Sequence, residues 1–214
     1  MIKIIAHRGL WKEVVEKNSL IAFQRAIKLG VGIETDVRDY QGEIVISHDL
    51  PDFTCLNFEY ALELIGPGLL ADNLPICINI KADGLSARLD KLLSKYQNLK
   101  YFIFDASIPE IILYKKRGMP FLYRLSEYEM PSQLLNHASG IWLDTFEQAP
   151  LDKIGLHNVL SFGKETFIVS PELHGNEHIQ FWQSLQAFQS LQDVYLCTDE
   201  VEDAIKLFGS SNEN

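Results

Sequence analysis

Short apolar segments rich in β-branched and aromatic residues recur along the chain, and amphipathic stretches separate them. Most are apolar at nearly every position rather than at alternate positions, which is typical of parallel strands buried on both faces. There are eight such segments: 3–7, 32–37, 76–81, 101–105, 121–126, 140–145, 167–172 and 194–198. This repetition predicts an α/β fold in which parallel strands alternate with helices.

The stretches between the strands have helical spacing. In 18–30, Asn18 or Ser19 is the expected N-cap, apolar residues follow every three or four positions, and Gly30 is the expected stop. The same spacing predicts helices over 58–65, 86–96, 109–117, 178–188 and 200–208.

Eight strands alternating with helices, with no Pro/Ser-rich linker, predict one domain over residues 1–214, folded as a (β/α)8 TIM barrel. Because such barrels typically have about 250 residues, we expect short loops here. An open doubly wound sheet is the alternative, although the chain has no Gly-x-Gly-x-x-Gly motif. After the second strand, a turn at 39–43 and a short strand at 44–49 predict a β-hairpin.

Composition restricts the partners and the location. The 29 acidic and 19 basic residues give a net charge of −10, which disfavours nucleic acid as a partner because phosphates attract a basic surface. The three cysteines are scattered, and we expect reduced thiols. No apolar stretch approaches the roughly 20 residues of a membrane span, and 1–7 does not fit a signal peptide, so we expect a cytoplasmic protein.

Polar residues collect at the predicted carboxyl ends of the first three strands and of the hairpin. They are His7, Arg8, Glu34, Asp36, His48, Asp49 and Lys81. In a barrel this end of the strands carries the catalytic side chains. A strand-end histidine or a Glu-x-Asp pair taken singly is more often structural, so the grouping is what indicates a functional site.

The residue types in this group suit displacement at a phosphodiester. Glu34 and Asp36 alternate along a strand and therefore point the same way, so a divalent cation, Mg²⁺ or Ca²⁺, would satisfy both carboxylates. His7 and His48 would supply a general base and a general acid. Arg8 and Lys81 are expected to bind the substrate through its non-bridging phosphate oxygens.

The order and spacing of these residues resemble the N-terminal signature of the glycerophosphodiester phosphodiesterase family. The matching positions are His7-Arg8-Gly9, Asn18-Ser19, Ala22-Phe23, Ala26, Gly30, Glu34-x-Asp36-Val37, Gly42, Val45 and His48-Asp49. The resemblance implies a (β/α)8 enzyme that uses a divalent cation to hydrolyse glycerophosphodiesters to an alcohol and glycerol phosphate. It also implies that His7 and His48 are the acid–base pair and that Glu34 and Asp36 are metal ligands.

The chain departs from this family at two places. Where the family's third strand has Glu-x-Lys, this chain has Asn79-Ile80-Lys81, so the resemblance makes Asn79 an uncharged third metal ligand and predicts weaker metal binding. The segment 50–75 holds one predicted helix in place of the family's capping segment. We therefore expect an open site that accepts small or polymeric phosphodiesters.

Two later strand ends carry further candidates. Trp142 and Glu172 are expected to bind substrate, and Asp144 and His174 are close to them in the sequence. A structural role is the alternative for each: Trp142 would fill the barrel rim, Asp144 would cap a helix, and His174 would bind a loop carbonyl.

Two other functions remain open on the sequence. Asn79 permits a catalytically silent barrel that binds phosphate or a metabolite, and the two histidines permit a phospholipase D-like transfer that leaves a cyclic phosphate. Because mere phosphate binding requires cations but no proton-transfer groups, the presence of both His7 and His48 favours an enzyme. The sequence does not determine the alcohol portion of the substrate or the oligomeric state.

Overall fold

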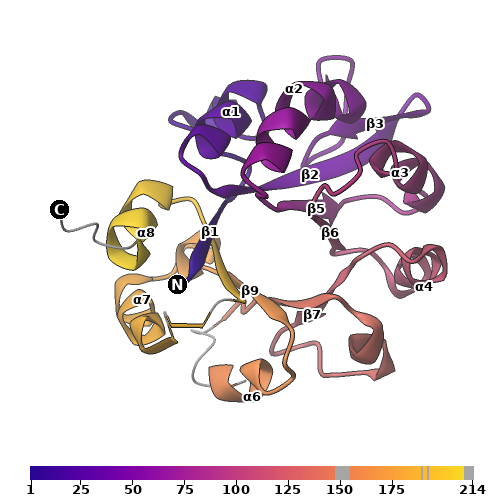
Figure 1. Cartoon of the computed structure of the whole chain (residues 1–214). Helices are drawn as coiled ribbons and strands as arrows, with labels where there is room; N and C mark the ends of the chain where they lie inside the picture. The colour runs from indigo at the N-terminus through magenta and orange to yellow at the C-terminus, as the bar shows by residue number, and fades with distance from the viewer. Residues whose placement is uncertain (148–154, 189, 192, 210–214) are drawn as a thin grey trace. The chain divides into compact units, whose positions relative to one another are not determined.

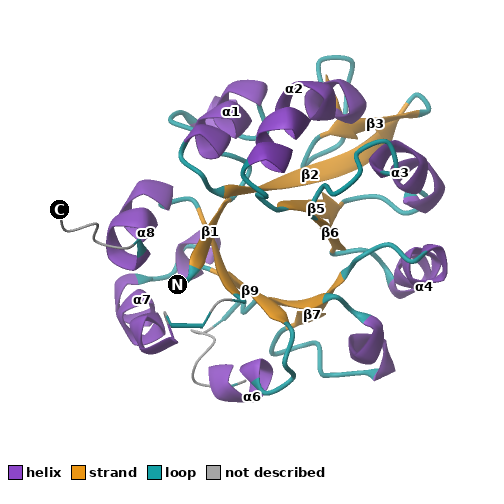
Figure 2. Cartoon of the chain, viewed as in Figure 1, coloured by secondary structure: helices purple, strands orange, loops and turns teal. Residues whose placement is uncertain are grey.

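The computed structural model describes residues 1–147, 155–188, 190–191 and 193–209, and it has a mixed α/β fold (Figures 1 and 2). Internal contacts divide the chain into two compact units. The N-terminal unit contains residues 6–121, and the C-terminal unit contains residues 1–5 and 122–214.

The sheet of the N-terminal unit combines parallel and antiparallel pairs. Strand β2 (Gly32–Tyr40) is parallel to β5 (Ile76–Ile80), which is parallel to β6 (Tyr101–Phe104). On its other side, β2 is antiparallel to β3 (Glu43–Ile46), which pairs with β4 (Leu56–Asn57). Gln41 and Gly42, between β2 and β3, both have positive φ, as a two-residue turn between antiparallel strands requires.

Four α-helices cover this sheet: α1 (Leu20–Lys28), α2 (Phe58–Ala71), α3 (Ser86–Leu93) and α4 (Ile108–Arg117). Ser19 is the N-cap of α1, because its hydroxyl accepts a hydrogen bond from the Ala22 amide. Gly30 follows the helix with φ of +72°, which suits the expected stop. A short 3-10 helix (Val14–Glu16) precedes α1.

Helix α2 is longer than the predicted segment 58–65, and it continues through Pro67. A proline within a helix removes one backbone hydrogen bond. Ile65 and Leu69, on either side of Pro67, are buried, so continued burial of the apolar face offsets that loss. Helix α3 is instead shorter than predicted, and its first amide, from Ser86, donates to the buried carboxylate of Glu110 in α4.

The C-terminal unit contains the other parallel strands. These are β7 (Leu122–Leu125), β8 (Gly140–Leu143), β9 (Glu165–Val169) and β10 (Val194–Thr198). Strand β1 (Lys3–Ala6) lies beside β10, and its first three residues belong to this unit. Neighbours from β7 to β10 pair in parallel. The helical segments are the 3-10 helices Gln133–His137, Pro171–His174 and Gln186–Phe188, with α6 (Leu156–Leu160), α7 (Ile179–Leu185) and α8 (Val201–Phe208).

Strand β9 ends earlier than the predicted segment 167–172. It stops at Val169, and Pro171 begins a 3-10 helix. Proline has no amide hydrogen to donate to a strand ladder, so the prediction was wrong at this end. Glu172 therefore belongs to a helical turn rather than to the strand.

Each of the eight predicted segments overlaps a strand, and their apolar side chains make the core of each unit. In the C-terminal unit, for example, the rings of Phe167 and Tyr195 stack with centroids 4.2 Å apart. Gly140 is required in β8 because a Cβ there would lie 2.6 Å from the carbonyl oxygen of Glu165. Among the described residues, no helix combines the length and the apolar character that crossing a membrane requires.

Candidate functional site

The site of the N-terminal unit begins at a sharp turn of the chain after β1. Arg8 and Gly9 both have positive φ, 57° and 82°. At Gly9 a Cβ would lie 2.8 Å from the backbone and side chain of Ala22 in α1, so only glycine fits. The turn directs the Arg8 amide to Glu34 Oε2 at 3.1 Å, and Arg8 Nε lies 3.0 Å from Asp36 Oδ2.

Glu34 and Asp36 are buried carboxylates on one face of β2. Their exposed fractions are 1% and 0%. Burial, together with the neighbouring charge of Asp36, raises the pKa of Glu34 to about 7, although His7, Arg8 and Lys81 act in the opposite direction. His7 Nε2 lies 3.9 Å from Glu34 Oε2. Two buried acids that lie two residues apart on one face of a strand are costly to ionise together unless a positive charge lies close to both.

Strand β5 brings Asn79 and Lys81 to the same place. Asn79 is the register partner of Asp36 in the parallel ladder. Lys81 Nζ lies 3.4 Å from Asp36 Oδ1. The side-chain oxygen of Asn79 is buried, and it accepts no hydrogen bond from any residue that the structure describes. A buried carbonyl oxygen without a donor is the kind of atom that a cation would satisfy.

Asn18 is a member of the site that the sequence analysis named as a possible helix cap and as a position of the family resemblance, but not as a site residue. Its amide nitrogen donates to Asp36 Oδ2 at 2.9 Å, and its amide oxygen accepts from Thr35 Oγ1 at 2.9 Å. The backbone amide of Asn18 donates to the Arg8 carbonyl oxygen at 2.9 Å. Its place in the family-like pattern was the available signal, because helical spacing alone explains Ser19 but not Asn18.

The return of β3 brings the residue before His48 to the acidic strand. The Ser47 amide donates to the Asp36 carbonyl oxygen at 3.1 Å, which places the next residue beside the acidic strand. The His48 ring is 43% exposed, and its Nδ1 lies 2.9 Å from Asp49 Oδ1. Asp49 thus helps to orient the ring through its Nδ1 atom.

The structure therefore brings His7, Arg8, Glu34, Asp36, Asn79 and Lys81 together, and His48 follows Ser47, whose backbone amide binds the Asp36 carbonyl oxygen. Across the described part of the chain, no three His, Cys, Asp or Glu side chains are grouped to hold a metal ion. The set that fits a cation here has two carboxylates and one amide oxygen, from Glu34, Asp36 and Asn79. Oxygen ligands of this kind suit Mg²⁺ or Ca²⁺ rather than a thiolate- or imidazole-binding metal.

The other two predicted residues lie in the C-terminal unit. Trp142 is buried in β8 and stacks on Phe167, with centroids 6.3 Å apart. Glu172 accepts short hydrogen bonds from the hydroxyls of Ser170 and Thr198 and a bond of 3.3 Å from the Asp199 amide. Their expected role in substrate binding remains a prediction.

A histidine–carboxylate pair also lies at the strand ends of this unit. His174 Nε2 is 2.7 Å from Asp144 Oδ1, and the hydrogen bond to Asp144 raises the pKa of His174. The Phe146 ring packs against the imidazole with centroids 5.0 Å apart. The structural alternatives were a helix cap for Asp144 and a hydrogen bond to a loop carbonyl for His174. The structure instead pairs the two residues with each other.

Two solved structures are similar to this chain along nearly its whole length. The crystal structure of glycerophosphodiester phosphodiesterase from Agrobacterium tumefaciens str. C58 matches with a TM-score of 0.71 and 17% sequence identity, over 97% of this chain and 99% of that one. The crystal structure of a glycerophosphoryl diester phosphodiesterase from Parabacteroides distasonis ATCC 8503 matches with a TM-score of 0.71 and 12% identity, over 100% of this chain and 90% of that one. No family model and no curated protein sequence matches. At these identities the similarity shows that the chain shares their fold.

Proposed function

We propose that this chain is a metal-dependent phosphodiesterase that hydrolyses a glycerophosphodiester to an alcohol and glycerol phosphate. The observation that carries the proposal is the burial of Glu34 and Asp36 beside the Asn79 side-chain oxygen, which accepts no hydrogen bond from the described residues. A fold alone supports many chemistries, so the argument depends on this group of residues.

The two similar crystal structures support the proposal, because both proteins are named as phosphodiesterases of glycerol diesters. Their similarity covers 97% and 100% of this chain, so we extend the proposal to the fold. It includes one (β/α)8 barrel domain over residues 1–214, with a hairpin after the second strand. A cytoplasmic location remains a prediction from the sequence.

Glu34, Asp36 and Asn79 would hold the divalent cation, which when bound supplies a Lewis acid that polarises a phosphoryl oxygen. The cationic groups of Arg8 and Lys81, both facing Asp36, are placed to hold the non-bridging oxygens of the phosphate and to stabilise the charge that develops on them.

The two histidines would transfer the protons. One takes a proton from the attacking water, and the other gives a proton to the oxygen of the leaving alcohol. Asp49 favours the His48 tautomer with a proton on Nδ1, so Nε2 is the atom of His48 that exchanges a proton. His7 lies next to Glu34, whereas Lys81 lies next to Asp36.

The test is a panel of glycerophosphodiesters incubated with the purified chain, with Mg²⁺, with Ca²⁺ and with excess EDTA, followed by an assay of glycerol phosphate. We expect release that depends on the metal. Undiminished turnover in EDTA would contradict the metal assignment. A cyclic phosphate product would instead show intramolecular transfer, and tight binding without any turnover would show a binding protein.

A further inference from the structure

Two loops of the N-terminal unit expose apolar side chains to an unusual degree. The first loop, residues 10–17, presents Val14 and Val15 with exposed fractions of 71% and 89%. The second loop, residues 49–55, presents Leu50 and Phe53 with exposed fractions of 88% and 86%. Single exposed apolar residues are ordinary on protein surfaces, but two such pairs on two loops of one site need an explanation.

Hydrogen bonds within each loop hold the conformation that exposes these side chains. In the first loop, Glu16 accepts from the Lys12 amide at 2.8 Å and pairs with Arg25, whose hydrogen bonds lower the pKa of Glu16 to about 2. In the second loop, Asp52 Oδ1 accepts from the amide and the hydroxyl of Thr54 at 2.8 and 2.6 Å. The exposure of the apolar pairs is therefore a property of folded loops.

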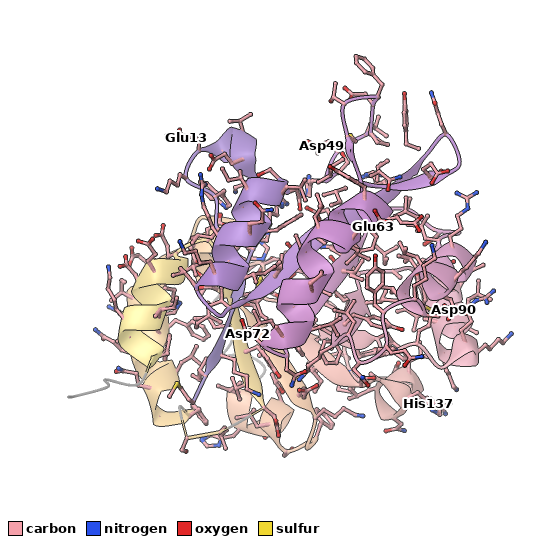
Figure 3. The ribbon with its side chains drawn as sticks, turned by 45° about the horizontal axis from the view of Figure 1, so that its top comes forward. Glu13, Asp49, Glu63, Asp72, Asp90 and His137 are labelled. Carbon is pink, nitrogen blue, oxygen red and sulfur yellow. The ribbon has the colours of Figure 1, made fainter. Side chains whose placement is uncertain are left out.

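Both loops begin at the candidate site. The first loop lies between Arg8 and Asn18, and both of these side chains contact the Asp36 carboxylate. The second follows Ser47, whose amide binds the Asp36 carbonyl oxygen, and His48. Figure 3 shows Glu13 of the first loop and Asp49 of the second toward the same end of this unit, with Asp72 at the far end of α2.

We propose that Val14, Val15, Leu50 and Phe53, here called the apolar rim, insert into the surface of a zwitterionic lipid layer. This inference rests on the proposed function and refines its substrate: the preferred phosphodiester carries a long apolar chain and is taken from a membrane or micelle. A diester held by Arg8 and Lys81 beside Asp36 would have its tail among the rim side chains, because both loops start from the residues that surround that carboxylate.

Charge selects a zwitterionic surface over an anionic one. Three exposed carboxylates, those of Glu13, Asp49 and Asp52, and one exposed ammonium group, that of Lys12, lie beside the two apolar pairs, and the whole chain carries a net charge of −10. Anionic lipids would repel these carboxylates, whereas the outermost charge of a phosphocholine or phosphoethanolamine head group is a cation that would attract them.

The test is co-sedimentation of the full chain with phosphatidylcholine vesicles. We expect the wild type to bind and the double variant Leu50→Ser/Phe53→Ser to partition at least tenfold more weakly, with Val14→Ser/Val15→Ser giving a similar loss. The matched control is Leu29→Ser, because Leu29 is 47% exposed at the other end of α1 and should not affect binding. Circular dichroism and thermal melting confirm that each variant is folded.

Three results would overturn the proposal: no binding of the wild type to phosphatidylcholine vesicles, equal binding of the rim variants, or stronger binding to phosphatidylserine vesicles. A dimer in gel filtration that Leu50→Ser/Phe53→Ser dissociates would instead assign the rim to a second copy of the chain.

A second measurement separates this inference from the proposed function. Hydrolysis of a long-chain lysophospholipid in micelles should fall at least tenfold in Leu50→Ser/Phe53→Ser, while hydrolysis of water-soluble glycerophosphoethanolamine should stay unchanged. If the wild type hydrolyses neither, the proposed function fails, and vesicle binding still decides the role of the rim.

Discussion

The strand ends of the two units contain buried or half-buried carboxylates in different electrostatic situations. In the C-terminal unit, Glu172 accepts hydrogen bonds from two hydroxyls and a backbone amide, and Asp144 binds His174. In the N-terminal unit, Glu34 and Asp36 are buried side by side, and burial raises the pKa of Glu34 to about 7. A carboxylate whose donors are all supplied by the fold stabilises that fold, whereas two acids crowded together are retained at a cost in stability. We therefore expect the first cluster to contribute mainly to stability and the second mainly to chemistry.

The largest effect is expected at the two histidines of the N-terminal unit. His7→Ala and His48→Ala should each lower kcat by about 10²- to 10⁴-fold, because each removes one proton transfer. His137→Ala is the matched control, since His137 is exposed at the end of a 3-10 helix in the other unit. Steady-state assays measure kcat, and thermal melting measures whether each variant is folded. A variant with near wild-type kcat would remove that histidine from the acid–base pair, and a variant that unfolds would indicate a structural role.

Glu172→Ala should act on stability rather than on chemistry. It leaves the hydroxyls of Ser170 and Thr198 and the Asp199 amide without their acceptor, at a cost of about 1–3 kcal/mol in the free energy of unfolding. Urea denaturation measures this, with the exposed Glu177→Ala as the control. If Glu172→Ala instead raised KM and kept full stability, the substrate-binding role would be supported and the contrast between the two units would fail.

Asn79→Glu tests whether the site of the N-terminal unit holds a cation. A third carboxylate beside Glu34 and Asp36 should strengthen metal binding about tenfold, because charge-assisted contacts are about twice as strong as neutral ones. Titration calorimetry of wild type, Asn79→Glu and Asn79→Ala with Mg²⁺ and Ca²⁺ gives the affinities without any assay of activity. Equal affinities in all three proteins would show that Asn79 is no ligand.

The smallest effect is expected at the pair of His174 and Asp144. The hydrogen bond to Asp144 raises the pKa of His174 above its ordinary value of 6.5. The stabilisation is therefore fully present below about pH 6.5 and is lost as the pH rises through the raised pKa. NMR titration should show His174 titrating above 6.5 in the wild type and lower in Asp144→Asn. The difference in melting temperature between the two proteins should shrink as the pH rises, and a constant difference would contradict this account.

The positions of the strands follow from the sequence because a strand that is buried on both faces is apolar at nearly every position. A segment such as Ile76–Ile80 is apolar at four of its five positions and is buried at all five, so its composition alone identifies it. The alternation of Glu34 and Asp36 likewise places both carboxylates on one face of their strand, because alternate residues of a strand point the same way. Local patterns of this kind also predicted Gly30 after the first helix.

Only the tertiary structure decided which residues these side chains contact, because the contacting residues come from segments far apart in the chain. The sequence left the helix cap open between Asn18 and Ser19, and only the contact with Asp36, eighteen residues away, assigns Asn18 to the site. The register of β2 with β5 places Asn79 opposite Asp36, and the turn at Pro171 ends β9 and directs Glu172 to Thr198. The spacing of apolar residues predicts which face of a helix or strand is buried. It does not predict which neighbouring element covers that face, because this depends on strand register and on the packing of side chains that are distant in the sequence.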